Sequence, residues 1–175
     1  MKNFLFLVLI SFSCKSQVSE PQKVGNSAPD LNVALLMEEE VGSNEIFDFS
    51  RYDYTLVNFW ASWCNPCIRE MPIIDSFYRT VTNEKIAVVG VTRILPNAGG
   101  KQKWKDELVR HRNLIRAIDV SYPILVDMSG KATEDYGVEE LPHTFLIDQK
   151  GIIIAEGIGT EKTLELITQL KNIKN

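Results

Sequence analysis

Two cysteines, separated by two residues, closely follow an apolar stretch that is typical of a buried strand. Residues 55–61 are mainly apolar, with Asn58 as the most polar member, and Cys64 and Cys67 come shortly after them. From Cys67 to Val81, apolar side chains recur at helical spacing. A buried strand that turns into a helix at Cys-x-x-Cys is the setting for thiol-disulfide chemistry. The pair therefore constrains both the fold, which must place a strand before a helix, and the chemistry.

The positions of the two cysteines predict different roles for them. Cys64 is expected at the N-terminus of the helix, where unpaired N–H groups and the positive end of the helix dipole favour a thiolate. This placement lowers the pKa of a thiol, so we expect Cys64 to be the attacking sulfur. Cys67 is expected one turn deeper, close enough to attack the mixed disulfide that Cys64 forms. Pro66 suits the first turn because its missing N–H group has no helical partner to lose.

Two other interpretations of the cysteine pair stay open on the residues alone, namely half of a zinc site and two inert core cysteines. A zinc site needs four ligands. The remaining candidates are Cys14, His111, His143 and scattered carboxylates. This supply of ligands favours exchange chemistry over zinc binding.

The segment from Phe59 to Pro72 resembles the active-site region of the thioredoxin superfamily, in particular that of the TlpA/ResA-type thiol-disulfide oxidoreductases of bacterial envelopes. Those proteins carry the pattern F-W-A-x-W-C-x-P-C-x-x-E-x-P, which this sequence matches. The resemblance runs from Val24 to about Lys171 and begins with a G-x-x-A-P-D segment that peroxiredoxin-like proteins share. It implies a thioredoxin-like α/β domain over residues 24–175, with a mixed central β-sheet flanked by helices on both faces.

The resemblance also implies a role for Glu70, three residues after Cys67. In ResA-like proteins a glutamate at this offset is thought to handle protons. A partly desolvated carboxyl near the sulfurs has a raised pKa and can exchange protons near neutral pH. The alternative is a solvent-facing helix residue opposite Arg69. Asn58 stands where cytosolic thioredoxins place a buried aspartate beneath the dithiol.

The segment from Leu141 to Asp148 resembles the second thioredoxin signature, in which a cis-proline faces the dithiol. Pro142 is the expected cis residue, since X-Pro is the one bond where the cis form is cheap enough for a fold to hold. Trp63, Pro66, Leu141 and His143 are expected to form the substrate-docking surface around it. The family more often carries Thr after this proline. His143 either tunes the site electrostatically or points to solvent, and the sequence favours neither.

The remaining pattern predicts one α/β domain without internal repeats. Strands are expected at residues 31–36, 45–49, 55–61, 86–91, 122–126, 143–148 and 152–156. Besides the helix after the cysteines, helices are expected at residues 104–118, in a short segment ending near Gly137, and after Thr160 as an N-cap. His111 lies on the apolar face of its helix and is expected to pack at the margin of the core.

The first residues indicate export and lipid attachment. Residues 1–13 combine a charged start with an apolar run, Phe4–Phe12, that is too short to span a bilayer as a helix. Ser13-Cys14 resembles the end of a bacterial lipoprotein signal, although Ser11 replaces the preferred aliphatic residue. Residues 14–23 are expected to be a tether, with Cys14 lipidated. The alternatives are an uncleaved hydrophobic anchor or a misread start codon.

These features together predict thiol-disulfide exchange at the bacterial cell envelope, on a membrane-anchored lipoprotein that faces the periplasm. The resemblance implies protein disulfides as substrates, among them apocytochrome c, and a membrane electron donor, with reduction favoured over oxidation. No cofactor is implied, and a formal net charge of −4 provides no electrostatic footprint for nucleic acid. The rival functions are a thiol peroxidase of peroxiredoxin type and a non-enzymatic metal or haem chaperone that uses the dithiol.

Overall fold

The computed structural model describes residues 24–37, 45–81, 85–94 and 100–174. The expected signal peptide (1–13), the tether (14–23) and Cys14 lie outside the described residues.

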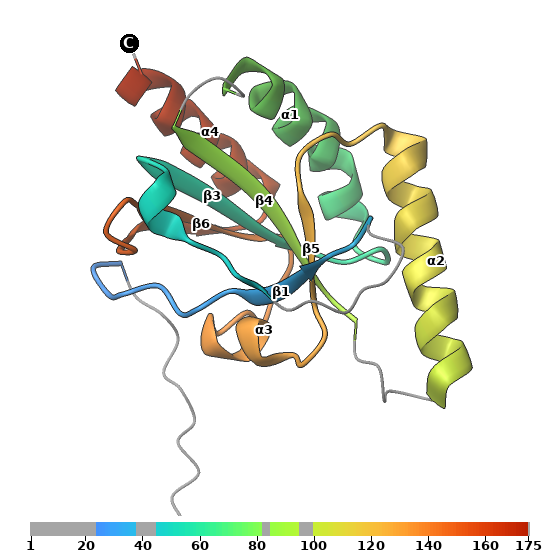
Figure 1. The fold of residues 1–175 in the computed structure, drawn as a ribbon. Helices are drawn as coiled ribbons and strands as arrows, with labels where there is room; N and C mark the ends of the chain where they lie inside the picture. Colours follow the sequence, from blue (N-terminus) through green and yellow to red (C-terminus); the bar gives the residue numbers. More distant parts are fainter. Residues whose placement is uncertain (1–23, 38–44, 82–84, 95–99, 175) are drawn as a thin grey trace, which may run out of the picture.

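A seven-stranded mixed sheet forms the centre of the domain (Figure 1), in the order β2-β1-β5-β4-β3-β6-β7. Strands β3, β4 and β5 run parallel, whereas β6 is antiparallel to β3, and the outer pairs are also antiparallel. The mixed sheet that the sequence predicted is confirmed. The strands are β1 (Asn32–Leu35), β2 (Glu45–Ile46), β3 (Tyr54–Trp60), β4 (Ile86–Arg93), β5 (Ile124–Asp127), β6 (His143–Asp148) and β7 (Ile153–Ile158).

Helices cover both faces of the sheet, as expected, but unequally. Helices α1, α2 and α4 lie against one face of the sheet, and α3 lies on the opposite face (Figure 1). Side chains of the first three helices share one apolar core with the sheet, and α3 contributes to a second core. The helices are α1 (Asn65–Val81), α2 (Gly100–Ile118), α3 (Lys131–Asp135) and α4 (Thr160–Lys174), with a short 3-10 helix, η1 (Phe49–Arg51).

The central strand β3 directs its side chains alternately to these two cores. Leu56 and Trp60 belong to the core beneath α1, while Val57 and Phe59 belong to the core on the α3 side. By the same alternation, Asn58 lies on the α1 face, where it is fully buried. A strand covered on both faces has no need of an amphipathic pattern, which is why residues 55–61 are almost uniformly apolar.

Several expected boundaries differ from the structure, and two of them have a clear local cause. Strand β2 ends at Ile46 rather than at residue 49, because Asp48 caps η1 by accepting the N–H of Ser50. Thr160 is the first residue of α4 and not its cap. Gly159 holds the cap position with φ +89°, a backbone conformation that glycine adopts without strain, and its carbonyl accepts the N–H of Thr163 at 3.2 Å.

His111 packs more deeply than expected. Its side chain lies inside the core rather than at its margin, with 1% of its surface exposed. The Nδ1 atom lies 2.8 Å from the carbonyl oxygen of Glu107, and Nε2 lies 3.2 Å from the Thr92 hydroxyl. Burial lowers the pKa of this imidazole. His111 is therefore a satisfied structural residue.

Candidate active site

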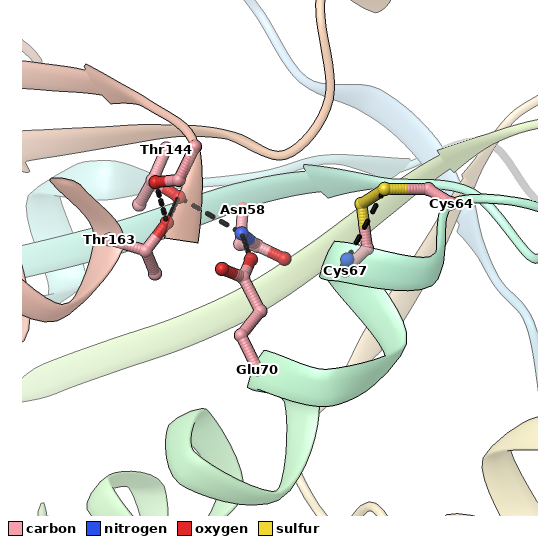
Figure 2. The surroundings of a disulfide bond; sticks show 7 residues. Asn58, Cys64, Cys67, Glu70, Thr144 and Thr163 are labelled. Atoms are coloured by element: carbon pink, nitrogen blue, oxygen red, sulfur yellow. Dashed lines mark hydrogen bonds between the residues drawn. A yellow bond between two sulfur atoms is a disulfide. The ribbon is translucent and has the colours of Figure 1, made fainter. Parts of the chain in front are cut away.

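Cys64 and Cys67 form a disulfide at the N-terminus of α1 (Figure 2), with their Cα atoms 5.3 Å apart. Cys64 immediately precedes the helix, and its carbonyl accepts the N–H of Ile68 at 3.1 Å. The N–H of Cys67 points to the Cys64 sulfur at 3.2 Å. Cys64 thus occupies the N-cap position, where its sulfur accepts one of the otherwise unpaired amide protons. Cys64 is 5% exposed and Cys67 is fully buried, so Cys64 is the more accessible residue of the pair.

Glu70 lies in the second turn of α1 and points into the domain, with none of its surface exposed. The solvent-facing alternative is therefore wrong. Its Oε1 atom accepts a hydrogen bond from Asn58 Nδ2 at 2.8 Å, while Oε2 has no hydrogen-bonding partner among the described residues. Burial raises the pKa of this carboxyl, and the bond from Asn58 opposes that effect without cancelling it.

Asn58 connects Glu70 to two threonines that the sequence analysis did not identify (Figure 2). A second hydrogen bond from Asn58 Nδ2 goes to Thr144 Oγ1 at 2.9 Å, and the Thr144 and Thr163 hydroxyls are 2.8 Å apart. All four residues are completely buried, and they come from β3, α1, β6 and α4. A signal for Thr163 existed in the sequence, because it falls on the apolar stripe of α4 with Ile167 and Leu170.

The Leu141–Pro142 peptide bond is cis, as the sequence predicted. The carbonyl of Pro142 accepts the N–H of Gly159 at 2.8 Å, which ties the start of β6 to the start of α4. Trp63 is 70% exposed, Pro66 is also exposed, and Leu141 is half-buried. These three docking candidates therefore keep surface available to a partner.

A cavity of about 260 Å³ lies beside the docking candidates. Trp63 and Leu141 both line it, together with Arg93 and Glu139, which place one charge of each sign at its wall. Pro66 and His143 do not line this cavity. The structure therefore brings together two of the four docking candidates.

His143 lies on the opposite face of the sheet from Glu70 and is 5% exposed. Its ring stacks on Phe145 with the centroids 4.3 Å apart, and neither ring nitrogen has a hydrogen-bonding partner within the described ranges. The Nε2 atom lies 3.7 Å from Glu156 Oε2. Burial lowers the pKa of this imidazole to about 4. The solvent-facing alternative is wrong, and little of the side chain is available for docking.

The described part of the chain lacks a metal-binding cluster and a membrane-spanning helix. No group of three or more His, Cys, Asp or Glu side chains there is arranged to hold a metal ion. No helix in the same ranges is long and apolar enough to cross a membrane.

Comparison with known proteins agrees with the geometry. Residues 24–156 match the AhpC/TSA family. The thiol-disulfide oxidoreductase ResA of Bacillus thuringiensis subsp. konkukian (strain 97-27) is 29% identical over 155 residues, which are 88% of this chain and 80% of ResA. The thioredoxin-like protein YneN of Bacillus subtilis (strain 168) is 32% identical over 143 residues, 81% of this chain and 76% of YneN.

Among solved structures, the crystal structure of StoA from Bacillus subtilis resembles the domain with a TM-score of 0.55 and 28% sequence identity. The similarity covers 79% of this chain and 96% of StoA. The relatives thus agree with the fold and with the dithiol at the start of α1. The chain belongs to the AhpC/TSA family, and it is a thiol-disulfide oxidoreductase with a thioredoxin-like fold.

Proposed function

We propose that the protein reduces disulfide bonds of other proteins, with Cys64 as the nucleophile and Cys67 as the resolving cysteine. The observation that carries this proposal is the Cys64–Cys67 disulfide at the N-terminus of α1, with the Cys67 N–H on the Cys64 sulfur. A helix N-terminus stabilises a thiolate at the N-cap position. The direction of transfer, toward reduced substrate, follows the resemblance to the TlpA/ResA-type proteins.

The exchange proceeds in two balanced steps. The Cys64 thiolate of the reduced protein attacks one sulfur of a substrate disulfide, that disulfide breaks, and the second substrate sulfur leaves as a thiolate. The Cys67 thiol loses its proton and attacks the Cys64 sulfur, which releases the first substrate sulfur and forms the disulfide seen in the structure. Two electrons pass to the substrate, and a membrane-bound dithiol donor returns them.

Glu70 is the proposed proton acceptor for Cys67. The two residues stand three positions apart on α1, a spacing that places side chains on one helix face. Burial raises the pKa of Glu70, which brings its titration nearer to neutral pH. Pro142 has the proposed role of shaping the docking surface, on which Trp63, Pro66 and Leu141 contact the bound polypeptide. The buried side chain of His143 is largely withdrawn from this surface.

The proposed location is the bacterial cell envelope, facing the periplasm, with lipidated Cys14 as the membrane anchor after removal of residues 1–13. Apocytochrome c is a proposed substrate, because its haem-binding thiols must be reduced before haem attachment. The wild-type protein should then partition with membranes, and Cys14→Ser should release it into the soluble fraction. Wild-type protein that is wholly soluble, with an unmodified Cys14, would contradict the anchor.

Trapping the covalent intermediate tests the exchange itself. Cys67→Ala removes the intramolecular attack that normally breaks the mixed disulfide, so the intermediate should accumulate. We expect disulfide-linked adducts with one or a few envelope proteins, visible on a non-reducing gel and lost on reduction. The double variant Cys64→Ala, Cys67→Ala is the matched control and should trap nothing. A single variant that traps no more than the double variant would exclude exchange with protein disulfides and favour the chaperone.

A thiol peroxidase is the second candidate, since the opening segment resembles peroxiredoxins and the chain matches the AhpC/TSA family. Peroxiredoxins normally carry Thr or Ser three residues before the reactive cysteine, where this chain has Ala61. We therefore expect little consumption of hydrogen peroxide by the reduced protein. Rapid peroxide consumption that depends on Cys64 would reverse the order of the two candidates.

A further inference from the structure

A buried chain of hydrogen bonds leads from Glu70 on α1 to the start of α4 (Figure 2). Asn58 Nδ2 lies 2.8 Å from Glu70 Oε1 and 2.9 Å from Thr144 Oγ1. The Thr144 and Thr163 hydroxyls are 2.8 Å apart, and the Thr163 hydroxyl donates to the Gly159 carbonyl at 3.4 Å. Asn58 and the two threonines therefore connect α1 to α4.

The protons along this chain have one consistent direction. Both protons of the Asn58 amide are used, one on Glu70 and one on Thr144. Because Thr144 accepts from Asn58, its own proton is free to go to Thr163, whose proton goes to the Gly159 carbonyl. Asn58 Oδ1, in contrast, has no partner among the described residues. The two bonds of its nitrogen are what hold the amide in this orientation.

We propose that Thr163, acting through Thr144, is a positioning residue that keeps the Asn58 amide with its nitrogen toward the Glu70 carboxylate. An amide has nearly the same shape when its nitrogen and oxygen exchange places, so hydrogen bonds decide its orientation. Without the Thr163 hydroxyl, the Thr144 proton loses its acceptor. That proton is satisfied again if the amide turns over and presents Oδ1, which also places an oxygen against the carboxylate and favours protonated Glu70.

Other groups that face Glu70 also influence its titration. Cys64, just before its helix, and Cys67, on the helix, are joined as a disulfide in the structure and do not titrate. Tyr122, which precedes β5, has a pKa raised by burial and, to a lesser extent, by the charges of Glu70 and Asp75. From α4, the Thr160 and Thr163 hydroxyls lower the pKa of Glu70, in the same direction as Asn58. A direct effect of the Thr163 hydroxyl would add to the effect of Thr144, whereas an effect that passes through Thr144 and Asn58 would not. Hydroxyl and amide groups thus oppose the rise in the pKa of Glu70 that burial causes.

The test is a titration of the Glu70 side-chain carboxyl by carbon NMR in the oxidised full-length chain, whose active-site sulfurs do not titrate. Thr163→Val keeps the shape of the side chain and removes the hydroxyl, and it should raise the pKa of Glu70 by about one unit, the equivalent of one net hydrogen bond. Thr163→Ser keeps the hydroxyl and should restore the wild-type titration. Thr163→Ala is the second variant if Val disturbs the packing.

Thr168→Val is the matched control, because this exposed α4 hydroxyl donates to the Leu164 carbonyl and does not reach the chain. Thr144→Val should raise the pKa as Thr163→Val does, and the double variant should add nothing, since both act on one amide. Additive shifts, or a folded Thr163→Val or Thr163→Ala protein with an unchanged Glu70 titration, would overturn the proposal.

The positioning role of Thr163 does not depend on the proposed proton transfer by Glu70. Only its effect on catalysis rests on that proposed function. The pH profile of disulfide reduction by the same variants separates the two. A shifted Glu70 titration with a shifted rate profile supports both proposals. A shifted titration with an unchanged rate profile supports the positioning role of Thr163 and contradicts Glu70 as the proton acceptor.

Discussion

His143 and Thr144 are neighbours on β6 and point to opposite faces of the sheet. The two faces differ in whether a buried polar side chain has hydrogen-bonding partners. On the α1 face, Thr144 belongs to a hydrogen-bonded chain that reaches Glu70 through Asn58. On the other face, His143 stacks on Phe145 and has no hydrogen bond to a described residue at either ring nitrogen. The Glu70 carboxyl on one face and the His143 imidazole on the other are both buried. The two sites differ in the hydrogen bonds that surround the titratable group.

The partners decide which face can exchange protons. Burial raises the pKa of Glu70, while the hydrogen bond from Asn58 limits the rise. Burial lowers the pKa of His143 to about 4, and no hydrogen bond opposes it. Near neutral pH, His143 is therefore a neutral packing residue, and Glu70 is the group whose titration moves toward the working range. The difference favours the α1 face for the proposed exchange of protons.

The largest expected effect comes from placing a second carboxyl in the hydrogen-bonded chain. Asn58→Asp puts two acidic groups against each other in a fully buried site, where both cannot ionise without strong repulsion. A folded-state pKa raised in this way gives stability that is present below the unfolded pKa and lost as pH rises. We expect the free energy of unfolding, measured in urea, to fall by about 3 kcal/mol at about pH 8 and by less at about pH 5.

The double variant Asn58→Asp, Glu70→Gln is the control for this prediction. It exchanges the two functional groups, so one carboxyl again faces one amide across the same pair of positions. Most of the lost stability should return. If the double variant is as unstable as Asn58→Asp, the loss arises from something other than carboxyl repulsion.

On the other face, His143→Leu removes an imidazole whose protonated form is destabilised by burial in the folded protein. The pKa of His143 is about 4 in the folded state, against an ordinary value of 6.5. The contribution of His143 to stability is therefore lost as pH falls from the ordinary pKa toward the folded one. Relative to His143→Leu, the wild type should lose about 2 kcal/mol between neutral pH and about pH 4.5. Parallel stability curves for the two proteins would show that His143 is charged in the fold, paired with Glu156 at 3.7 Å.

The features of these two faces could be predicted where they depend on residues close together in the sequence, and could not where they depend on contacts between distant residues. The strand before the dithiol, the start of α1 and the cis Leu141–Pro142 bond are set by residues close together in the chain, and these predictions are confirmed. The inward orientation of Glu70 follows from how α1 docks on the sheet. Thr144 meets Asn58 across 86 residues of sequence. Local patterns contain no information on such contacts.

The position of His143 shows the same limit on a strand. β6 is buried on both faces over nearly its whole length, so its sequence lacks the alternation that would tell one face from the other. The cap of α4 was missed for a different reason. Thr is a preferred N-cap residue, but only Gly159 among the neighbouring residues adopts the positive φ that turns β7 into the helix.

Glu70→Gln gives the smallest expected change in stability and the sharpest test of the comparison. Burial holds the folded pKa of Glu70 above its ordinary value of 4.5. Its contribution to stability is therefore fully present below that value and is lost as pH rises through the folded pKa. Gln keeps the size of the side chain and an oxygen that accepts from Asn58, but it does not titrate. This part of the pH dependence should disappear from urea unfolding curves of the variant.

The rate of disulfide reduction by Glu70→Gln decides what the buried carboxyl is for. If Glu70 accepts the proton of Cys67, the variant should lose one ionisation from its pH–rate profile, whereas His143→Leu should leave the profile unchanged. The same pair of proteins thus compares the two faces in one assay. A Glu70→Gln protein with a flattened stability curve and a wild-type rate profile would make Glu70 a structural residue. The two faces would then differ in hydrogen bonding alone, and the proton that leaves Cys67 would have to go directly to solvent or to the substrate.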